Sequence, residues 1–426
     1  MPEVELLVHS ARQLVTCACQ GVAKRGRTLS DVGIILDGAV AVSDGVIVDV
    51  GTSRDIQAAY TAREQVDASG KVVCPGWIDS HTHAVFMGER IEEFELRLQG
   101  ASYTEILKAG GGILHTVQAT RRASVEELVS EALPRLQRML AWGSTTVEIK
   151  TGYGLNVADE LKMLEAIQRL HRGHPIDCVP TFLGAHAVPP EFLGDADGYV
   201  DLVVSEMIPA VAEWYQGSVF AREHIPIYCD VFCEVGVFDR TQSERILMAG
   251  LEHGFGVKVH ADEFENLGSV PLACELGAVS VDHLDATPGD EISRLARSDT
   301  MGVVLPAVNF NFGSCRFADA RRMIEAGVAV ALATDFNPGS APCLSMPLAM
   351  AIGCRYQRLL PSESMNAATL NAAFALGMQK KMGSLEVGKQ ADLLILKCPD
   401  YRYPVYEFGT NFVEMVIKAG RPVYCD

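Results

Sequence analysis

Histidines and acidic residues with the chemistry of metal ligands follow several short apolar runs of this chain. His81 and His83 are separated by one residue, and in extended chain residues i and i+2 project to the same side, so both imidazoles can reach one ion. His260, His283 and Asp335 each come at the end of another apolar run. Imidazole and carboxylate suit a borderline divalent cation, and catalytic sites leave one position open. Each residue alone could equally cap a helix, but together they predict a metal site.

A carboxylate and a rigid turn lie next to these residues. Glu263 comes three residues after His260, where it could shuttle protons to and from water activated by a metal, unless it is a helix-capping or surface residue. Segment 335–340 reads Asp-Phe-Asn-Pro-Gly-Ser. Pro338 fixes one φ angle and Gly339 frees the next peptide, so the backbone there could face a ligand. On its own the segment would be interpreted only as a turn.

Bringing these residues together requires strands that end at a common edge. Eight apolar runs each stop at a polar residue: 72–78, 145–149, 179–183, 228–232, 257–259, 279–281, 302–305 and 328–333. Helical stretches with apolar residues at three- and four-residue steps lie between them, for example 157–170, 241–253, 291–297 and 317–325. These β-α units favour a (β/α)₈ barrel of the TIM type, an α/β fold in which all strand ends converge on one mouth. An open doubly wound sheet is the alternative, although it usually has fewer strands and a dinucleotide-binding glycine motif.

Both ends of the chain are rich in predicted strands. Residues 38–50 alternate around Asp44-Gly45, a dipeptide that favours a tight hairpin because both central residues need positive φ. Near the other end, segments 391–397, 413–417 and 422–424 also read as strands. We therefore expect residues 1–70 and 372–426 to form one small β-sandwich domain, and residues 71–371 to form the barrel.

The composition excludes some partners. The chain has 36 Lys and Arg against 54 Asp and Glu, a net charge of 36 − 54 = −18, which disfavours nucleic acid and anionic membranes as partners. A small anionic substrate would need a cation placed locally. The 12 cysteines are scattered without a CxxC pair, the start of the chain lacks a signal-peptide pattern, and no apolar run reaches the roughly 18 residues of a membrane span. We expect a cytoplasmic protein.

These residues, in this order, resemble the amidohydrolase superfamily, whose members pair a metal-bearing barrel with a β-sandwich from both chain ends. The resemblance runs from the first hairpin to segment 383–393, nearly the whole chain. It is closest to those members that hydrolyse the cyclic amide 4-imidazolone-5-propanoate to N-formimidoyl-L-glutamate in histidine degradation. The segments that carry this finer resemblance are 88–90, 93–100, 109–113, 150–155, 184–186 and 334–339.

The resemblance implies roles for particular residues. It implies one metal ion per chain, Zn²⁺ or Fe²⁺/Fe³⁺, with the ligands His81, His83, His260 and Asp335. It places the small anionic substrate against Arg90, Tyr153, His186 and Glu263, with Asn337, Gly339 and Ser340 around its glutamate-like end. It also implies a homodimer.

Ring opening of such a substrate needs water to attack a carbonyl and a ring nitrogen to leave with a proton. We hypothesise that the metal activates the water and polarises the carbonyl, that His283 with Asp335 accepts the proton of the water, and that Glu263 protonates the leaving nitrogen. Arg90 would supply the local cation and Tyr153 a phenolic hydrogen bond. Sequence alone does not decide which group is the acid and which the base.

Three other functions are compatible with the same pattern. A deaminase of a cyclic amidine or purine base would use a similar metal site and release ammonia, but its substrate would gain little from Arg90. A binuclear cyclic amidase would carry a carbamylated Lys150 bridging two metals, whereas the resemblance implies one metal and an ion pair of Lys150 with Glu148 or a place in the substrate loop. A scaffold protein with the same fold would have lost its ligands, and all of the expected ligands are present here.

Overall fold

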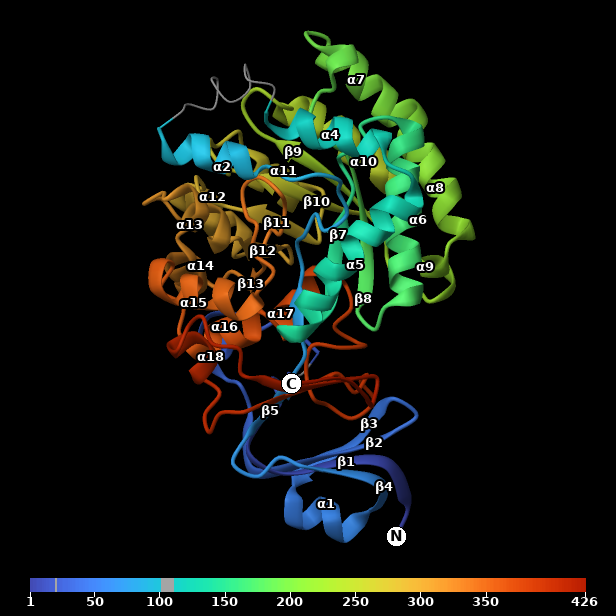
Figure 1. Ribbon diagram of the computed structural model, residues 1–426. Coiled ribbons are helices and arrows are strands. Elements are labelled where there is room, and N and C mark those ends of the chain that lie inside the picture. Colours follow the sequence, from blue (N-terminus) through green and yellow to red (C-terminus); the bar gives the residue numbers. More distant parts are fainter. Residues whose placement is uncertain (20, 101–110) are drawn as a thin grey trace.

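Eight parallel strands form one of two eight-stranded sheets in the computed structural model, which describes residues 1–19, 21–100 and 111–426. The strands neighbour one another in chain order, and helices surround them (Figure 1). Their bounds are β6 Trp77–Asp79, β7 Ser144–Lys150, β8 Asp177–Ala185, β9 Tyr228–Cys233, β10 Gly256–Ala261, β11 Ser280–His283, β12 Met301–Val304 and β13 Val330–Leu332. The predicted (β/α)₈ barrel is confirmed. Residues 109 and 110 of the expected segment 109–113 lie outside the described residues.

The barrel closes between its first and last strands through the segments that follow them. The backbone N–H of Asp335 donates to the carbonyl of His81 at 3.0 Å, and the N–H of His83 donates to the carbonyl of Phe336 at 2.8 Å. Thr334 donates to Asp79 from its backbone at 3.0 Å and from its hydroxyl at 2.6 Å. Three of the expected metal ligands therefore lie at this seam.

One predicted strand is wrong in its extent. Run 72–78 is divided into β5 (Val72–Pro75), which belongs to the second sheet, and β6 of the barrel. Pro75 has no N–H to continue a ladder, and Gly76 donates its N–H to the carbonyl of Asp392 at 3.0 Å. The next residue, Trp77, donates to the carbonyl of Gly143, so the chain crosses from one sheet to the other at this point.

The predicted helices are confirmed, with small shifts of their ends. Run 157–170 is α6 (Val157–Gly173), and 241–253, 291–297 and 317–325 are α10 (Arg240–Glu252), α12 (Gly289–Leu295) and α14 (Ala320–Ala326). The other helices are η1 Gly26–Ser30, α1 Ser53–Ala59, α2 Ile91–Leu98, α4 Ile113–Arg122, α5 Val125–Ala141, η2 Pro190–Phe192, α7 Ala196–Leu202, η3 Val203–Met207, α8 Ile208–Gly217, α9 Val219–Arg222, α11 Ser269–Glu275, α13 Pro306–Phe312, α15 Met346–Tyr356, α16 Pro361–Ala367, α17 Leu370–Ala375 and α18 Tyr403–Tyr406.

The second sheet is built from both ends of the chain, as expected, and lies below the barrel in Figure 1. Its strands are β1 Glu3–Val15, β2 Ile34–Ser43, β3 Val46–Thr52, β4 Thr61–Asp67, β5, β14 Leu393–Leu396, β15 Val413–Lys418 and β16 Arg421–Cys425. Asp44 and Gly45 form the predicted hairpin with φ angles of +52° and +74°. The N–H of Ile47 donates to the carbonyl of Lys389, so the β2–β3 hairpin folds back toward β14 and the sheet encloses a small apolar core.

The expected boundaries between the two units do not coincide with the elements. Strand β5 follows the boundary at residue 70 but pairs with β1 and β14. Helix α17 spans the boundary at residues 371 and 372, and it contacts the barrel strands β12 and β13. The division of the chain into two units at residues 70 and 371 therefore stays a prediction.

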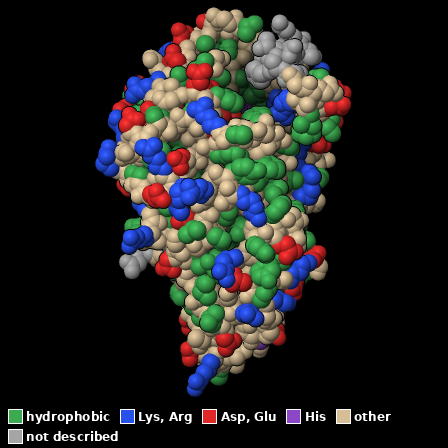
Figure 2. Space-filling view, turned by 90° about the vertical axis from the view of Figure 1, so that its left-hand side faces the viewer, with side chains coloured by type: hydrophobic (Ala, Val, Ile, Leu, Met, Phe, Trp, Pro, Cys, Tyr) green, Lys and Arg blue, Asp and Glu red, His purple; other side chains and the backbone are tan. Residues whose placement is uncertain are grey.

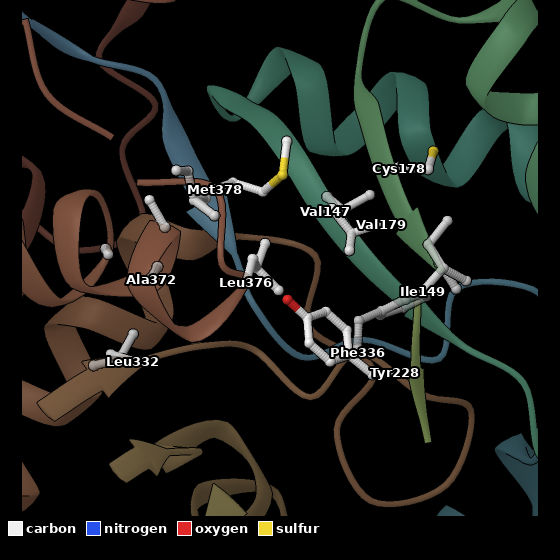
Figure 3. Packing of buried hydrophobic residues seen from close by; sticks show 14 of the residues in the cluster. Val147, Ile149, Cys178, Val179, Tyr228, Leu332, Phe336, Ala372, Leu376 and Met378 are labelled. Carbon is white, nitrogen blue, oxygen red and sulfur yellow. The ribbon is translucent and has the colours of Figure 1, made fainter. Parts of the chain in front are cut away.

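The larger core lies between the barrel strands and their helices. Apolar side chains of neighbouring strands, such as Val147 and Val179, gather there, with Leu376 and Met378 among the same buried residues (Figure 3). On the face of the molecule shown in Figure 2, basic side chains are interspersed with acidic ones. None of the helices in the described ranges has both the length and the apolar character needed to cross a membrane.

A buried ion network joins the barrel to the second sheet. Nζ of Lys418 in β15 lies 2.8 Å from Oδ2 of Asp177 at the start of β8 and 2.6 Å from Oδ2 of Asp392. Burial on its own raises the pKa of the Asp177 carboxyl. The ammonium groups of Lys418 and Lys381 outweigh this effect and lower the pKa to about 2. The stabilisation by this carboxylate is therefore complete above its ordinary pKa of 3.8 and is lost as the pH falls toward about 2.

We expect the substitution Lys418→Met to lower the free energy of unfolding by about 3 kcal/mol at neutral pH, because it removes the ammonium group that bridges the Asp177 and Asp392 carboxylates. Urea unfolding followed by circular dichroism measures this change. Lys397→Met is the matched control, because Lys397 pairs with Asp426 at the exposed surface and should contribute less than about 1 kcal/mol. Equal effects of the two substitutions would contradict a special contribution of the buried network.

Candidate metal centre and substrate site

Four atoms of the expected metal ligands lie close together at the carboxyl ends of the barrel strands. Oδ1 of Asp335 lies 3.3 Å from Nε2 of His81 and 3.4 Å from Nε2 of His83. Nε2 of His83 lies 3.5 Å from Nε2 of His260. Ligand atoms about 2.1 Å from a tetrahedral cation are about 3.4 Å from one another, so these spacings fit one shared ion. The structure brings together all four residues that the sequence predicts as ligands.

The cluster is buried and electrostatically incomplete without a cation. Nε2 of His81 and Oδ1 of Asp335 have no hydrogen-bond partner among the described residues. Asp335 also has a left-handed φ of +52°, which is strained for a residue with a side chain and is typical of functional sites. Lone pairs that face one another at such distances repel, and a cation between them removes the repulsion. Three imidazoles and one carboxylate are a donor set that fits zinc or iron.

Two carboxylates stand behind the imidazoles. Nδ1 of His81 lies 2.6 Å from Oδ2 of Asp282, and Nδ1 of His260 lies 3.0 Å from Oδ2 of Asp230. The His81 contact is a hydrogen bond, whereas the His260 contact has ion-pair distance without hydrogen-bond geometry. A proton held on Nδ1 by a neighbouring carboxylate leaves the lone pair of Nε2 free for a metal. Burial raises the pKa of Asp282, but Lys258, His81 and Lys150 hold it below its usual range. The site therefore has the carboxylate–imidazole arrangement common among metal centres.

Lys150 lies behind the histidines among buried carboxylates. Its Nζ is 2.7 Å from Oδ2 of Asp230 and 3.1 Å from Oε2 of Glu148, which agrees with the expected ion pair. Burial lowers the pKa of Lys150, but the carboxylates of Asp230, Glu148 and Asp282 raise it well above its usual range. Carbamylation needs a neutral amine, so this environment disfavours the binuclear alternative.

His283 and Glu263 form a pair beside the cluster. Nε2 of His283 lies 3.8 Å from Oε2 of Glu263, and neither ring nitrogen of His283 has a hydrogen-bond partner among the described residues. Burial lowers the pKa of His283 well below its usual range, and nearby His260 adds to this effect while Asp335 opposes it. Burial, with the carboxylates of Asp335 and Asp285, raises the pKa of Glu263 well above its usual range. These opposite shifts favour a neutral imidazole on His283 and a protonated carboxyl group on Glu263.

The loop that carries Glu263 is held by Glu234, which follows β9. Oε2 of Glu234 accepts the backbone N–H of Phe264 at 2.9 Å, and Oε1 accepts those of Val235 at 2.9 Å and Glu265 at 3.2 Å. Glu234 is 3% exposed, so these bonds are shielded from water. They fix the position of Glu263 relative to β10.

Tyr153 lies in a loop that one buried carboxylate organises. Glu160 in α6 accepts the backbone N–H groups of Gly154 and Leu155 through Oε1, both at 2.8 Å. Helix α6 begins directly after this loop, where the Asn156 side chain accepts the N–H of Asp159 at 2.9 Å. The first turn of α6 thus sets where the Tyr153 side chain enters the site.

His186 closes the same side of the site. Its ring is stacked on that of His83, with 4.9 Å between centroids, and lies 5.4 Å from the ring of Tyr153. Nδ1 of His186 is 3.1 Å from the carbonyl of Gly152. Gly152 has φ +100°, and a Cβ there would collide with His186, so the position requires glycine. Burial lowers the pKa of His186 well below its usual range, which keeps the ring neutral.

Arg90 lies at the mouth, but it already has a partner. Its Nε and Nη2 donate to Oε2 of Glu93 at 2.9 and 2.7 Å. The guanidinium group also packs over Gly339, where a Cβ would meet Nη1. The resemblance implies that Arg90 contacts the substrate, and no partner for Arg90 is predicted from the sequence, although the three-residue spacing to Glu93 at the start of a helix is a signal for such a pair.

The Asn337 side chain is used inside its own turn. Its Nδ2 donates to the carbonyl of Asp335 and to Oγ of Ser340, both at 2.7 Å. Its Oδ1 accepts the N–H groups of Gly339 at 2.8 Å and Ser340 at 2.7 Å. Since all four hydrogen-bonding positions of this amide are taken, Asn337 shapes the turn between the ligand Asp335 and the Gly339–Ser340 backbone and leaves no free group for a substrate.

Several residues that position this site are absent from the sequence analysis as functional residues. Asp230 and Asp282 lie within or directly after runs interpreted as barrel strands, and an acidic residue inside such a run was the available signal. Glu160 lies in a helix whose outer face is also acidic, so nothing in the sequence distinguishes it, whereas Glu93 could be identified only through its three-residue spacing from Arg90. Their roles depend on backbone N–H groups that only the folded loops supply.

Comparisons with known proteins agree with this geometry. A model described as the Amidohydrolase family matches residues 241–423. An imidazolonepropionase from Chloroflexus aggregans is 53% identical over 423 residues and covers 99% of both chains. Another from Herpetosiphon aurantiacus is 52% identical over 423 residues, which cover 99% of this chain and 98% of that protein.

A solved structure shows the same fold at lower sequence similarity. An adenosine deaminase from Xanthomonas campestris with bound zinc has a TM-score of 0.70 and 20% identity, covering 99% of this chain and 93% of its own. At this identity the likeness concerns the fold alone. The predicted resemblance to amidohydrolases is confirmed, and the identity and coverage of the two closer relatives show that the chain belongs to the imidazolonepropionase family.

Proposed function

We propose that this chain is a hydrolase that opens 4-imidazolone-5-propanoate to N-formimidoyl-L-glutamate in histidine degradation. The observation that carries the proposal is the placement of the His283–Glu263 pair beside the converging atoms of His81, His83, His260 and Asp335, with Arg90 at the mouth. A cyclic amide needs a proton acceptor for water, a proton donor for the leaving nitrogen and a group that activates the carbonyl. The names of the two relatives support the same substrate.

We propose that His81, His83, His260 and Asp335 hold one ion of zinc or iron. When bound, such an ion lowers the pKa of a water molecule toward neutrality and polarises a carbonyl oxygen. The carboxylates of Asp282 and Asp230 keep two of the imidazoles with Nε2 toward the ion. The side of the cluster away from these carboxylates faces His283 and Glu263, which leaves that side for water and substrate.

The pKa of His283 is lowered and that of Glu263 is raised, which supports His283 as the group that accepts a proton and Glu263 as the group that donates one. A neutral His283 accepts the proton of the attacking water, with Asp335 close enough to stabilise the imidazolium that forms. A protonated Glu263 donates to the ring nitrogen as the carbon–nitrogen bond breaks. One bond to oxygen forms and one to nitrogen breaks, so no oxidant or reductant takes part.

Arg90 binds the propanoate carboxylate in this proposal. The substrate carboxylate takes a place beside Nη1, while Glu93 holds Nε and Nη2 and fixes the plane of the guanidinium group. Tyr153 and His186 contact the ring from the opposite side, and the Gly339–Ser340 backbone lines the carboxylate end. This arrangement supplies the local cation that a chain of net charge −18 requires.

We also propose that the protein acts as a homodimer in the cytoplasm. All twelve cysteines are free, which is typical of a reducing compartment. Light scattering of the purified protein measures the oligomeric state, and a mass of one chain of 46.1 kDa would contradict the dimer.

The metal proposal predicts about one zinc or iron ion per chain after loading and dialysis. His260→Asn should weaken metal binding by more than about 100-fold, because ligand loss costs at least as much as loss of a supporting residue. Competition with a chromophoric chelator measures the affinity. His115→Asn changes an exposed histidine of α4 and serves as the control. Two ions per chain would contradict the proposal and favour the binuclear site.

The substitution Glu263→Gln should reduce kcat by about 10²- to 10⁴-fold while the metal content stays unchanged, because it removes only the proton that the leaving nitrogen receives. Turnover is followed by the loss of absorbance of the imidazolone ring, with ammonia assayed in the same sample. Glu265→Gln, at an exposed position two residues away, is the control. Full activity of Glu263→Gln would refute the proton-donor role, and stoichiometric ammonia would support a deaminase.

Arg90→Gln should lower kcat/KM by about 10- to 100-fold, mainly through KM, because a charge-assisted hydrogen bond contributes about 1.5–3 kcal/mol. The loss should vanish for an imidazolone that lacks the propanoate group. Steady-state kinetics on both compounds, with the surface variant Arg122→Gln for comparison, separate the two cases. An equal loss on both compounds would show that Arg90 does not recognise the carboxylate.

A further inference from the structure

Beneath the proposed metal centre, five fully buried charged side chains form one network. Its members are Lys150, Lys258, Glu148, Asp230 and Asp282, and each has a relative exposure of 0%. Nζ of Lys150 lies 2.7 Å from Asp230, 3.1 Å from Glu148 and 3.6 Å from Asp282. Charges removed from water in this way are costly unless they are paired, so the positions of these groups depend on one another.

Lys150 contacts the same oxygen atoms that contact the metal-binding imidazoles. Oδ2 of Asp230 lies 2.7 Å from Lys150 and 3.0 Å from Nδ1 of His260. Oδ2 of Asp282 lies 3.6 Å from Lys150 and 2.6 Å from Nδ1 of His81. One ammonium group therefore lies between the two carboxylates that support two different ligands from two different strands.

We propose that Lys150 is a positioning residue of the metal site, which sets the orientation of His81 and His260 by fixing the Asp282 and Asp230 carboxylates between itself and the two imidazoles. The inference rests on the proposed function, because it concerns the affinity of that site for its ion. Without the ammonium group the two carboxylates repel each other, and their contacts with Nδ1 of the two rings are no longer held in place. Nε2 of His81 and Nε2 of His260 are then no longer held pointing at the same metal position.

Lys258 provides the contrast within the same network. It is equally buried, and its Nζ lies 2.8 Å from Glu148 and 3.3 Å from the carbonyl of Ser80. Within the described part of the chain, Glu148 is the one carboxylate at ion-pair distance from it. Lys258 therefore acts on Asp282 through its charge, which helps to hold the pKa of that carboxyl below its usual range, but among the described residues it forms no ion pair with Asp282 or Asp230.

The test compares Lys150→Met with Lys258→Met, because each removes one buried ammonium group and keeps a flexible apolar side chain. Zinc affinity is measured by chelator competition, the coordination geometry by the visible spectrum of the cobalt-loaded protein, and folding of the metal-free protein by urea unfolding. We expect a 10- to 100-fold loss of zinc affinity and an altered cobalt spectrum for Lys150→Met. For Lys258→Met we expect an affinity within about threefold of the parent and an unchanged spectrum.

Parent-like zinc affinity of Lys150→Met, or equal losses for the two variants, would overturn the inference. If the methionine variants do not fold, Lys150→Gln and Lys258→Gln provide the same comparison with a polar side chain, and parent-like affinity of Lys150→Gln overturns it equally. Zinc binding by the unsubstituted chain distinguishes failure of the proposed metal centre from failure of the inference about Lys150. Absence of zinc binding by the parent refutes the metal centre itself, whereas zinc binding by the parent with no difference between the variants refutes only the role of Lys150.

Discussion

The seam between the first and last barrel strands is the constraint on which the site depends. His81 and His83 come from the segment after β6 and Asp335 from the segment after β13, and the backbone hydrogen bonds that close the barrel lie among these residues. Closing the barrel thus places Oδ1 of Asp335 3.3 Å from Nε2 of His81 and 3.4 Å from Nε2 of His83. A metal ion bound at this point would hold the same atoms together, so barrel closure and ion binding would stabilise the same arrangement.

Behind this seam, metal-binding imidazoles, carboxylates and a lysine follow one another into the barrel interior. The imidazoles lie against Asp282 and Asp230, and these carboxylates lie against Lys150, which also contacts Glu148. Lys150 orients the carboxylates, and the carboxylates orient the imidazoles. All of these side chains are shielded from water inside the barrel. Charged groups in such an environment keep fixed positions because any displacement would leave a buried charge unpaired. A rigid donor set of this kind suits chemistry that requires one water molecule to be aimed at one carbonyl.

The sequence predicts the features that are marked by a particular residue type at the end of a strand or in a turn. His260, His283 and Asp335 could be identified because each ends an apolar run, and the hairpin at Asp44-Gly45 because its backbone requires positive φ. The break between β5 and β6 is missed because apolar periodicity is the same on both sides; Pro75-Gly76 is the sequence signal for it, and the pairing of the two strands with different sheets shows it. The internal bonding of Asn337 and the loop anchor Glu160 depend on side-chain orientation, which spacing does not encode.

The most direct test of one shared cation is X-ray absorption spectroscopy of the zinc-loaded protein. The account predicts a single zinc site with about four nitrogen and oxygen neighbours at about 2.0–2.1 Å, with the outer-shell scattering of imidazole rings. A neighbouring metal at about 3.5–4 Å, or sulfur at about 2.3 Å, would contradict it, because neither is compatible with an ion held by three imidazoles and the Asp335 carboxylate.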